Sequence, residues 1–171
     1  VGIGTTAPAS LLDVQGTVQV GGIPDAVGNV TAPLQIEGTS MNTSAISVFR
    51  NSNDTSSPYL VLGKSRGGAV GADTIVQDND EVGAIVFAAA DGVDRLSRTA
   101  EIRSLVGGTP GANDTPGELL FLTTADGAQS STERMRIMAD GKIGINIATP
   151  ASLLDVRGTV QVGVDGTGYD V

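Results

Sequence analysis

Histidine, cysteine and tryptophan are all absent from the 171 residues of this chain. Without histidine and cysteine, the chain lacks the commonest general base and a common nucleophile of enzymes. Without cysteine, it forms no disulfide. Aromatic residues make up only 3% of the chain, whereas sites that cleave sugars usually offer aromatic platforms to the substrate. We therefore expect no enzymatic activity, no catalytic residues and no bound cofactor.

The densest acidic cluster, QDNDE, contains Asp78, Asp80 and Glu81. A pair of carboxylates can hydrolyse a glycosidic bond, and DNDEVG is similar to the start of a calcium-binding loop. However, such a loop requires an acidic ligand at its twelfth position, where this chain has Ala89. The cluster is better explained as a solvated turn before a strand, and we expect no metal site.

Basic residues and long apolar runs are also scarce. Ten Lys and Arg residues stand against nineteen Asp and Glu residues, which gives a formal net charge of −9. Proteins that bind nucleic acids neutralise phosphates with Lys and Arg, so we expect no nucleic-acid partner. The longest nearly apolar run, Val82–Ala90, is far shorter than the roughly 18 residues of a membrane helix. We therefore expect no membrane insertion.

The residues that are present favour β-structure. The chain has 24 glycines and 40% hydrophobic residues, and Val, Ile and Thr occur in short runs between clusters of Gly, Asn, Asp and Pro. These patterns predict an all-β fold, namely a jelly-roll-like β-sandwich. In ELLFLTT, residues 118–124, both alternating faces are apolar, so this strand should be covered on two sides. The expected strands are Leu34–Glu37, Ala45–Phe49, Tyr59–Lys64, Val82–Ala90, Thr99–Val106 and Glu118–Thr123.

One stretch occurs twice in the chain. PASLLDV is found at Pro8–Val14 and again at Pro150–Val156, and 15 of the 21 positions in Val1–Gly21 are identical to those in Ile143–Gly163. This spacing is longer than the roughly 20–50 residues of a solenoid repeat. We interpret the repeat as a connector on either side of a globular insert, within an internal segment of a longer, periodic protein. The predicted division is a connector at 1–21, a β-sandwich domain at 22–132, and a second connector with the start of the next unit at 133–171.

The connector sequence LLDVQGTVQVG predicts a short hairpin. A three-residue loop at Gln15–Thr17 would set Val14 opposite Val18 and Leu12 opposite Val20, so that apolar residues face each other. Upstream of the second copy, ERMRIMADGKIGI predicts alternating strands joined by an Asp140–Gly141 turn. Gly144, between two isoleucines, would suit a close backbone approach between chains.

A two-stranded hairpin is marginally stable in water, and nothing in its own sequence covers its apolar face. Three parallel copies around a threefold axis would bury these faces against one another. The predicted partners are therefore further copies of the same chain and its successive repeats. The residues expected at the trimer interface are Ile3, Leu12, Val14, Val18, Val20, Ile143, Ile145, Leu154, Val156, Val160 and Val162.

The stretch STERMRIMADGKIGINIATPASLLDVRGTV resembles a pattern found in bacteriophage tail fibres and tailspikes, often just ahead of an intramolecular chaperone domain. The segments FRNSND, PYLVLGKSRG and GTPGANDTPGELLFLTTADG are similar to a domain of marine-phage fibre proteins. The resemblance implies a homotrimeric, shaft-forming virion protein, and it brings no catalytic residues with it. Asn146 and Ile147 depart from the usual pattern, which Gly4 and Thr5 follow in the first copy.

Two alternatives stay open from the sequence. A bacterial surface adhesin or extracellular filament could use the same physics at the cell surface, and a glycan-cleaving tailspike would need acidic residues that converge in a groove. Recognition of a host glycan or protein would fall to exposed loops, although inert turns explain these loops equally well. The candidate receptor-facing residues are Asn51, Asn53, Asp54, Arg66, Asp73, Asn113 and Asp114.

Overall fold

The computed structural model describes residues 1–3, 6–7, 13–14, 18–20, 27, 32 and 34–161. The chain divides into two compact units, Val1–Leu60 and Val61–Val171. Within the residues described, the secondary structure is made of β-strands with one short 3-10 turn at Met41–Thr43, so the all-β prediction is confirmed.

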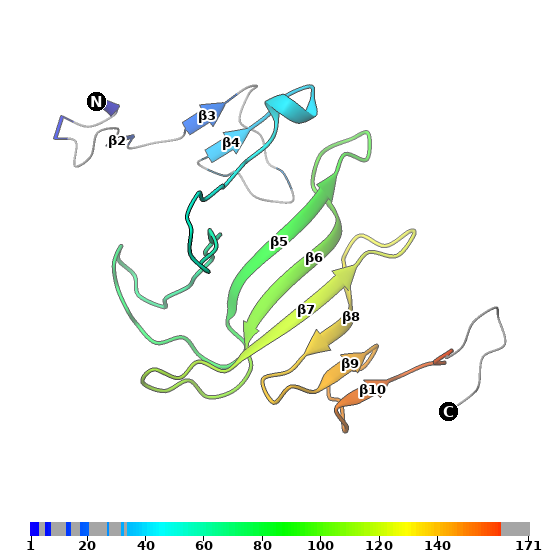
Figure 1. The fold of residues 1–171 in the computed structure, drawn as a ribbon. Coiled ribbons are helices and arrows are strands. Elements are labelled where there is room, and N and C mark those ends of the chain that lie inside the picture. The colour runs from blue at the N-terminus through cyan, green and yellow to red at the C-terminus, as the bar shows by residue number, and fades with distance from the viewer. Residues whose placement is uncertain are drawn as a thin grey trace. The chain divides into compact units, whose positions relative to one another are not determined.

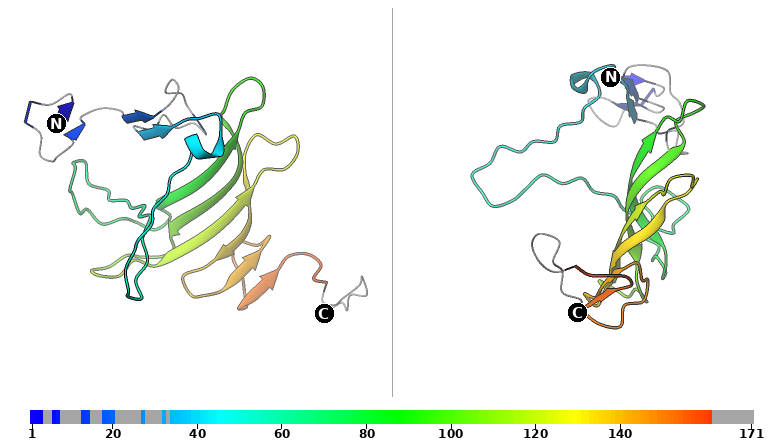
Figure 2. Two further views of the ribbon diagram at one scale, coloured as in Figure 1. Left: turned by 45° about the horizontal axis from the view of Figure 1, so that its top comes forward. Right: turned by 90° about the vertical axis from the view of Figure 1, so that its right-hand side faces the viewer.

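The second unit is built on one six-stranded sheet, whose strands lie side by side in chain order (Figure 1). Strands β5 to β9 form an antiparallel meander, and β10 joins the far edge parallel to β9. Seen nearly edge-on, the strands form a single layer of the kind that a β-sandwich fibre domain contains (Figure 2). The boundary predicted between residues 132 and 133 lies within β8. The strands are β5 (Glu81–Ala89), β6 (Ser97–Val106), β7 (Gly117–Thr123), β8 (Thr132–Ile137), β9 (Ile143–Ile145) and β10 (Leu154–Val156).

The strands of this sheet follow the alternation in the sequence closely. The predictions for 82–90, 99–106 and 118–123 are confirmed within two residues at each end. The turn at Asp140–Gly141 is also confirmed, because Gly141 has a φ of 83° and its N–H donates to the carbonyl of Met138. A left-handed residue favours glycine, since glycine has no Cβ to clash with the backbone.

In the part of the first unit that the structure describes, four short strands form two parallel pairs. Strand β1 (Gly2–Ile3) pairs with β2 (Asp13–Val14), and β3 (Val18–Val20) pairs with β4 (Leu34–Ile36). The strand predicted at Leu34–Glu37 is therefore confirmed.

Two predicted strands are wrong. The stretches Ala45–Phe49 and Tyr59–Lys64 have strand-forming sequences, but in the structure they run without strand pairing. Their side chains are largely exposed: Phe49 by 81% and Leu60 by 77%. A strand is stabilised by its cross-strand neighbours, and among the described residues these two stretches have none.

The predicted connector hairpin is also wrong. Strands β2 and β3 do not pair with each other, because β2 pairs with β1 and β3 with β4. The second copy of the repeat forms the same parallel pair, with Asp155 opposite Gly144 and Val156 opposite Ile145. The matching positions of the first copy, 142 residues earlier, have the same register. Alternation alone did not distinguish the two pairings, because both place apolar residues side by side.

Gly144 makes a close backbone approach within its own chain, while the predicted approach between chains stays a prediction. Gly144 is buried, and a Cβ added there would lie 2.2 Å from the backbone oxygen of Ile147. The backbone turns sharply after β9 at Asn146, whose φ is 55°. Glycine is thus required so that the chain can fold back toward β10.

Candidate assembly interface

The pairing register gives the sheet two chemically different faces. Residues directly opposite each other in neighbouring strands point to the same side, and residues two apart in one strand share a face. One ladder of opposed residues crosses all six strands and is entirely apolar. It consists of Ile85, Ile102, Phe121, Met135, Ile145 and Val156.

A second ladder on the same side completes what we call the apolar face. It contains no charged residue and consists of Gly83, Ser104, Leu119, Ile137, Ile143 and Leu154. None of the residues in these two ladders is fully buried in the single chain, and Ile85 is 45% and Leu154 59% exposed. Exposed apolar surfaces of this kind mark interaction sites in many proteins, which makes this face the candidate interface.

The apolar face is hollowed near β5. The side chain of Leu62 lies over Gly83, so that a Cβ added at Gly83 would come within 2.7 Å of the Cβ of Leu62. Beside it is a hollow of about 190 Å³, lined mainly by Leu62, Ile85, Ile102, Ser104 and Leu119. The hollow offers room for an apolar side chain.

On the opposite side of the sheet, which we call the charged face, arginines and glutamates form ion pairs with one another within the chain. Leu120 and Leu122 are only 5% and 8% exposed, and the register places Leu120 between Arg103 and Arg136. Long arginine side chains cover apolar surface with their aliphatic stems while their charged ends stay hydrated. The guanidinium of Arg136 also bridges Glu118 at 2.8 Å and Glu133 at 2.6 Å.

Glu101 is the most deeply buried acid of the charged face, with 2% of its surface exposed. Its carboxylate accepts hydrogen bonds from Ser131, at 2.6 Å, and from Arg103 and Arg98. Burial acts to raise the pKa of Glu101, but the hydrogen bonds from Ser131 and Arg103 and the two arginine charges outweigh it. The pKa is therefore held below its ordinary value of 4.5.

This arrangement predicts a pH-dependent stability. Because the folded-state pKa of Glu101 is depressed, its contribution is fully present above pH 4.5 and is lost as pH falls through the folded-state pKa. We expect Glu101→Gln to lower the free energy of unfolding by about 1–3 kcal/mol at pH 7. The deficit should shrink at pH 3. Urea denaturation at fixed protein concentration checks this, with Asp126→Asn in the exposed loop after β7 as the control. A deficit that is equal at both pH values would contradict the assignment.

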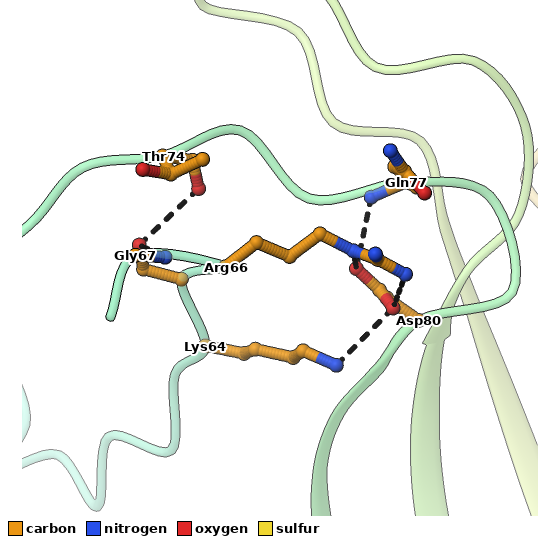
Figure 3. A network of polar contacts seen from close by, with 7 residues as sticks. Lys64, Arg66, Gly67, Thr74, Gln77 and Asp80 are labelled. Carbon is orange, nitrogen blue, oxygen red and sulfur yellow. Dashed lines mark hydrogen bonds and ion pairs between the residues drawn. The ribbon is translucent and has the colours of Figure 1, made fainter.

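A second buried acid, Asp80, fastens the chain segment before β5 to the sheet (Figure 3). Its carboxylate accepts hydrogen bonds from Arg66 at 2.6 and 2.7 Å, from Lys64 at 3.1 Å and from the backbone N–H of Gln77 at 2.9 Å. The bond from Arg66, followed by that from Gln77, holds the pKa of Asp80 well below its usual range. Asp78 accepts from the backbone N–H of Gly108. The acidic cluster thus organises a turn at the start of β5.

The structure brings four of the predicted interface residues together on the apolar face: Ile143, Ile145, Leu154 and Val156. Val14, Val18 and Val20 lie in β2 and β3, and Ile3 lies opposite Val14 in β1. Val160 is 42% exposed and outside the strands, while Leu12 and Val162 lie outside the described residues. Sequence reasoning missed the central residues of the face, which are Ile85, Ile102, Phe121 and Met135. The doubly apolar pattern of ELLFLTT was the available signal for this surface.

The candidate receptor-facing residues fall into two groups. Asn51, Asn53, Asp73, Asn113 and Asp114 are exposed in loops. Asp54 and Arg66 instead have structural partners. Asp54 accepts from Arg50, Ser52 and the backbone of Ser56, and Arg66 is bonded to the buried Asp80. Arg66 is therefore better described as an anchor of the chain.

The part of the chain that the structure describes holds no group of three or more acidic, His or Cys side chains that could bind a metal ion. In those residues, no helix has the length and apolar character needed to span a membrane.

Comparison with known proteins shows which solved structure has a similar fold. No protein-family model matches the chain, and no curated protein matches it. Among solved structures, the chain is similar to the carboxy-terminal domain of the bacteriophage T5 L-shaped tail fibre, with a TM-score of 0.54 and 16% sequence identity. The match covers 76% of this chain and 49% of the tail-fibre chain, so this chain spans about half the length of the domain that it matches. The predicted resemblance to a tail-fibre protein is thus confirmed at the level of the fold.

Proposed function

We propose that this chain is a structural segment of a trimeric bacteriophage tail fibre, in which three parallel copies bring their apolar faces together around a common axis. The observation that carries the proposal is the ladder of six apolar residues across the sheet, which stays partly exposed in the single chain. Burying apolar area contributes roughly 25 cal/mol per Å², and a threefold axis multiplies every contact by three.

The charged face supports this orientation of the sheet. Its arginines and glutamates pair with one another within the chain, so this face can meet water without a partner. Association through the charged face would require these ions to lose their water, which is costly. Association through the apolar face carries no such penalty, because its two ladders contain no charged residue.

The similarity to a tail-fibre domain supports a place in the virion over one at a bacterial surface. Both buried acids, Asp80 and Glu101, are hydrogen-bonded to arginines of the same chain. Their contacts thus stabilise the fold, which agrees with a structural role. We infer that the segment acts as a spacer which holds receptor-binding parts of the fibre. The loops at 51–57, 67–73 and 107–116 are the candidates if the segment itself presents a contact to the host.

The connector offers a direct test of the proposal. Leu154→Asp should abolish trimer formation, because it would place three carboxylates near the axis, whereas Gln161→Asp at an exposed position outside the strands should leave the trimer intact. In the single chain Leu154 is 59% exposed, so the substitution should not prevent folding. Light scattering after size-exclusion chromatography, with circular dichroism to verify β-structure, measures both. Equal assembly of the two variants would reject the proposed orientation.

A further inference from the structure

Strand β5 is an open edge of the six-stranded sheet. Within the residues that the structure describes, β5 pairs with β6 alone. Edge strands of natural proteins are usually shortened or protected by charged residues and proline, yet β5 has nine residues and no charge or proline from Val82 to Ala89. Bulges bracket a regular stretch, Gly83–Phe87, whose side chains Ile85 and Phe87 are 45% and 50% exposed. Such an edge is suited to accept a further strand.

The chain also contains a strand-like stretch that has no partner. Ala45–Phe49 is uncharged and rich in residues that favour β-structure, and its Ile46 and Phe49 are 75% and 81% exposed. The turn that follows is held by Arg50, whose guanidinium donates to both carboxylate oxygens of Asp54 and to the carbonyl of Ser56. The stretch thus leads directly into a hydrogen-bonded turn, and we call it the arm of the first compact unit.

The other unpaired stretch, Tyr59–Leu62, is less suited to reach a neighbouring copy. Leu62 lies over Gly83 of its own sheet, and Lys64 and Arg66 are bonded to Asp80, which directly precedes β5 of that sheet. Three residues span at most about 10 Å, so Tyr59 stays close to its own sheet. Ala45–Phe49 lies beyond the Arg50–Asp54 turn and has the longer reach.

We propose that Ala45–Phe49 of one copy adds as a strand to the β5 edge of a second copy, so that neighbouring chains of the fibre exchange arms. The five residues match the length of the regular stretch Gly83–Phe87. Both partners are uncharged. Because side chains alternate along a strand, Ile46 and Val48 share one side and can extend the apolar face beside Ile85 and Phe87.

This inference rests on the proposed trimer, because it requires a neighbouring copy. The chain has no cysteine, so introduced thiols report only the intended contacts. The full chain is co-expressed in two tagged forms, one with Val48→Cys and the other with Ile85→Cys or Phe87→Cys, and is then oxidised. A matched control replaces Val48→Cys by Val70→Cys, which lies on an exposed loop outside the arm.

We expect a trimer in which a cysteine at position 48 of one tagged form is joined by a disulfide to a cysteine at position 85 or 87 of the other. The yield of this cross-link should be at least tenfold higher than that of the Val70→Cys control. A trimer without this cross-link, or with equal cross-linking in the control, would overturn the arm exchange and leave the trimer standing. A folded monomer would overturn both proposals. A further variant carries both cysteines in one chain. If its disulfide forms only within that chain, the arm pairs with its own sheet, and the exchange is contradicted.

Discussion

Replacing Phe121 with aspartate is expected to yield a folded monomer in place of a trimer. Phe121 lies in the middle of the apolar ladder, between Ile102 and Met135, and it is incompletely buried in the single chain. The carboxylate would therefore be tolerated in the isolated sheet. In the assembly it would be buried without a partner, at a cost of several kcal/mol per chain.

The control for this experiment is Phe121→Leu, which keeps an apolar side chain at the same position and should keep the trimer. Light scattering reports the mass and far-ultraviolet circular dichroism reports the sheet. A trimer that persists with aspartate at position 121 would show that the apolar face lies outside the interface.

Truncation of Leu120 should instead reduce the stability of the folded chain, because this residue acts on folding and not on assembly. Leu120 is 5% exposed, on the charged face, and Leu→Ala at buried sites costs about 2–5 kcal/mol. Its neighbour Leu119 points to the apolar face and is 36% exposed. We expect Leu120→Ala to lower the free energy of unfolding by that amount even in the monomeric Phe121→Asp background.

In the same background, Leu119→Ala should cost less than about 1 kcal/mol, since its side chain is partly hydrated before and after the change. In the otherwise unaltered chain, Leu119→Ala should instead weaken the trimer. Urea denaturation of both variants in both backgrounds separates the two effects. Equal losses at positions 119 and 120 in the monomer would contradict the assignment of the two faces.

The sequence predicted most of the central sheet, for a physical reason that can be named. In 82–90, 99–106 and 118–123, alternation of apolar residues coincides with turn residues at both ends, so local and tertiary preferences agree. The doubly apolar pattern of ELLFLTT also had a structural meaning, because Leu120 and Leu122 are buried on one face. Leu119 and Phe121 lie on the other.

Pairing between strands could not be predicted in the same way. Alternation fixes which residues share a face, but it does not select the partner strand, and the connector strands pair in parallel with Gly2–Ile3 and Ile143–Ile145 instead of forming hairpins. The ladder from Ile85 to Val156 depends on five registers at once, so no local pattern reveals it. Ala45–Phe49 has the composition of a strand but finds no partner among the described residues, because pairing depends on neighbours that sequence composition does not specify.

The mass of the assembled chain tests the central claim most directly. Light scattering after size-exclusion chromatography, at micromolar concentration, should give three times the 17.2 kDa of one chain. A folded species of 17.2 kDa at the same concentration would contradict the account, because the apolar face would then be stable in water without a partner.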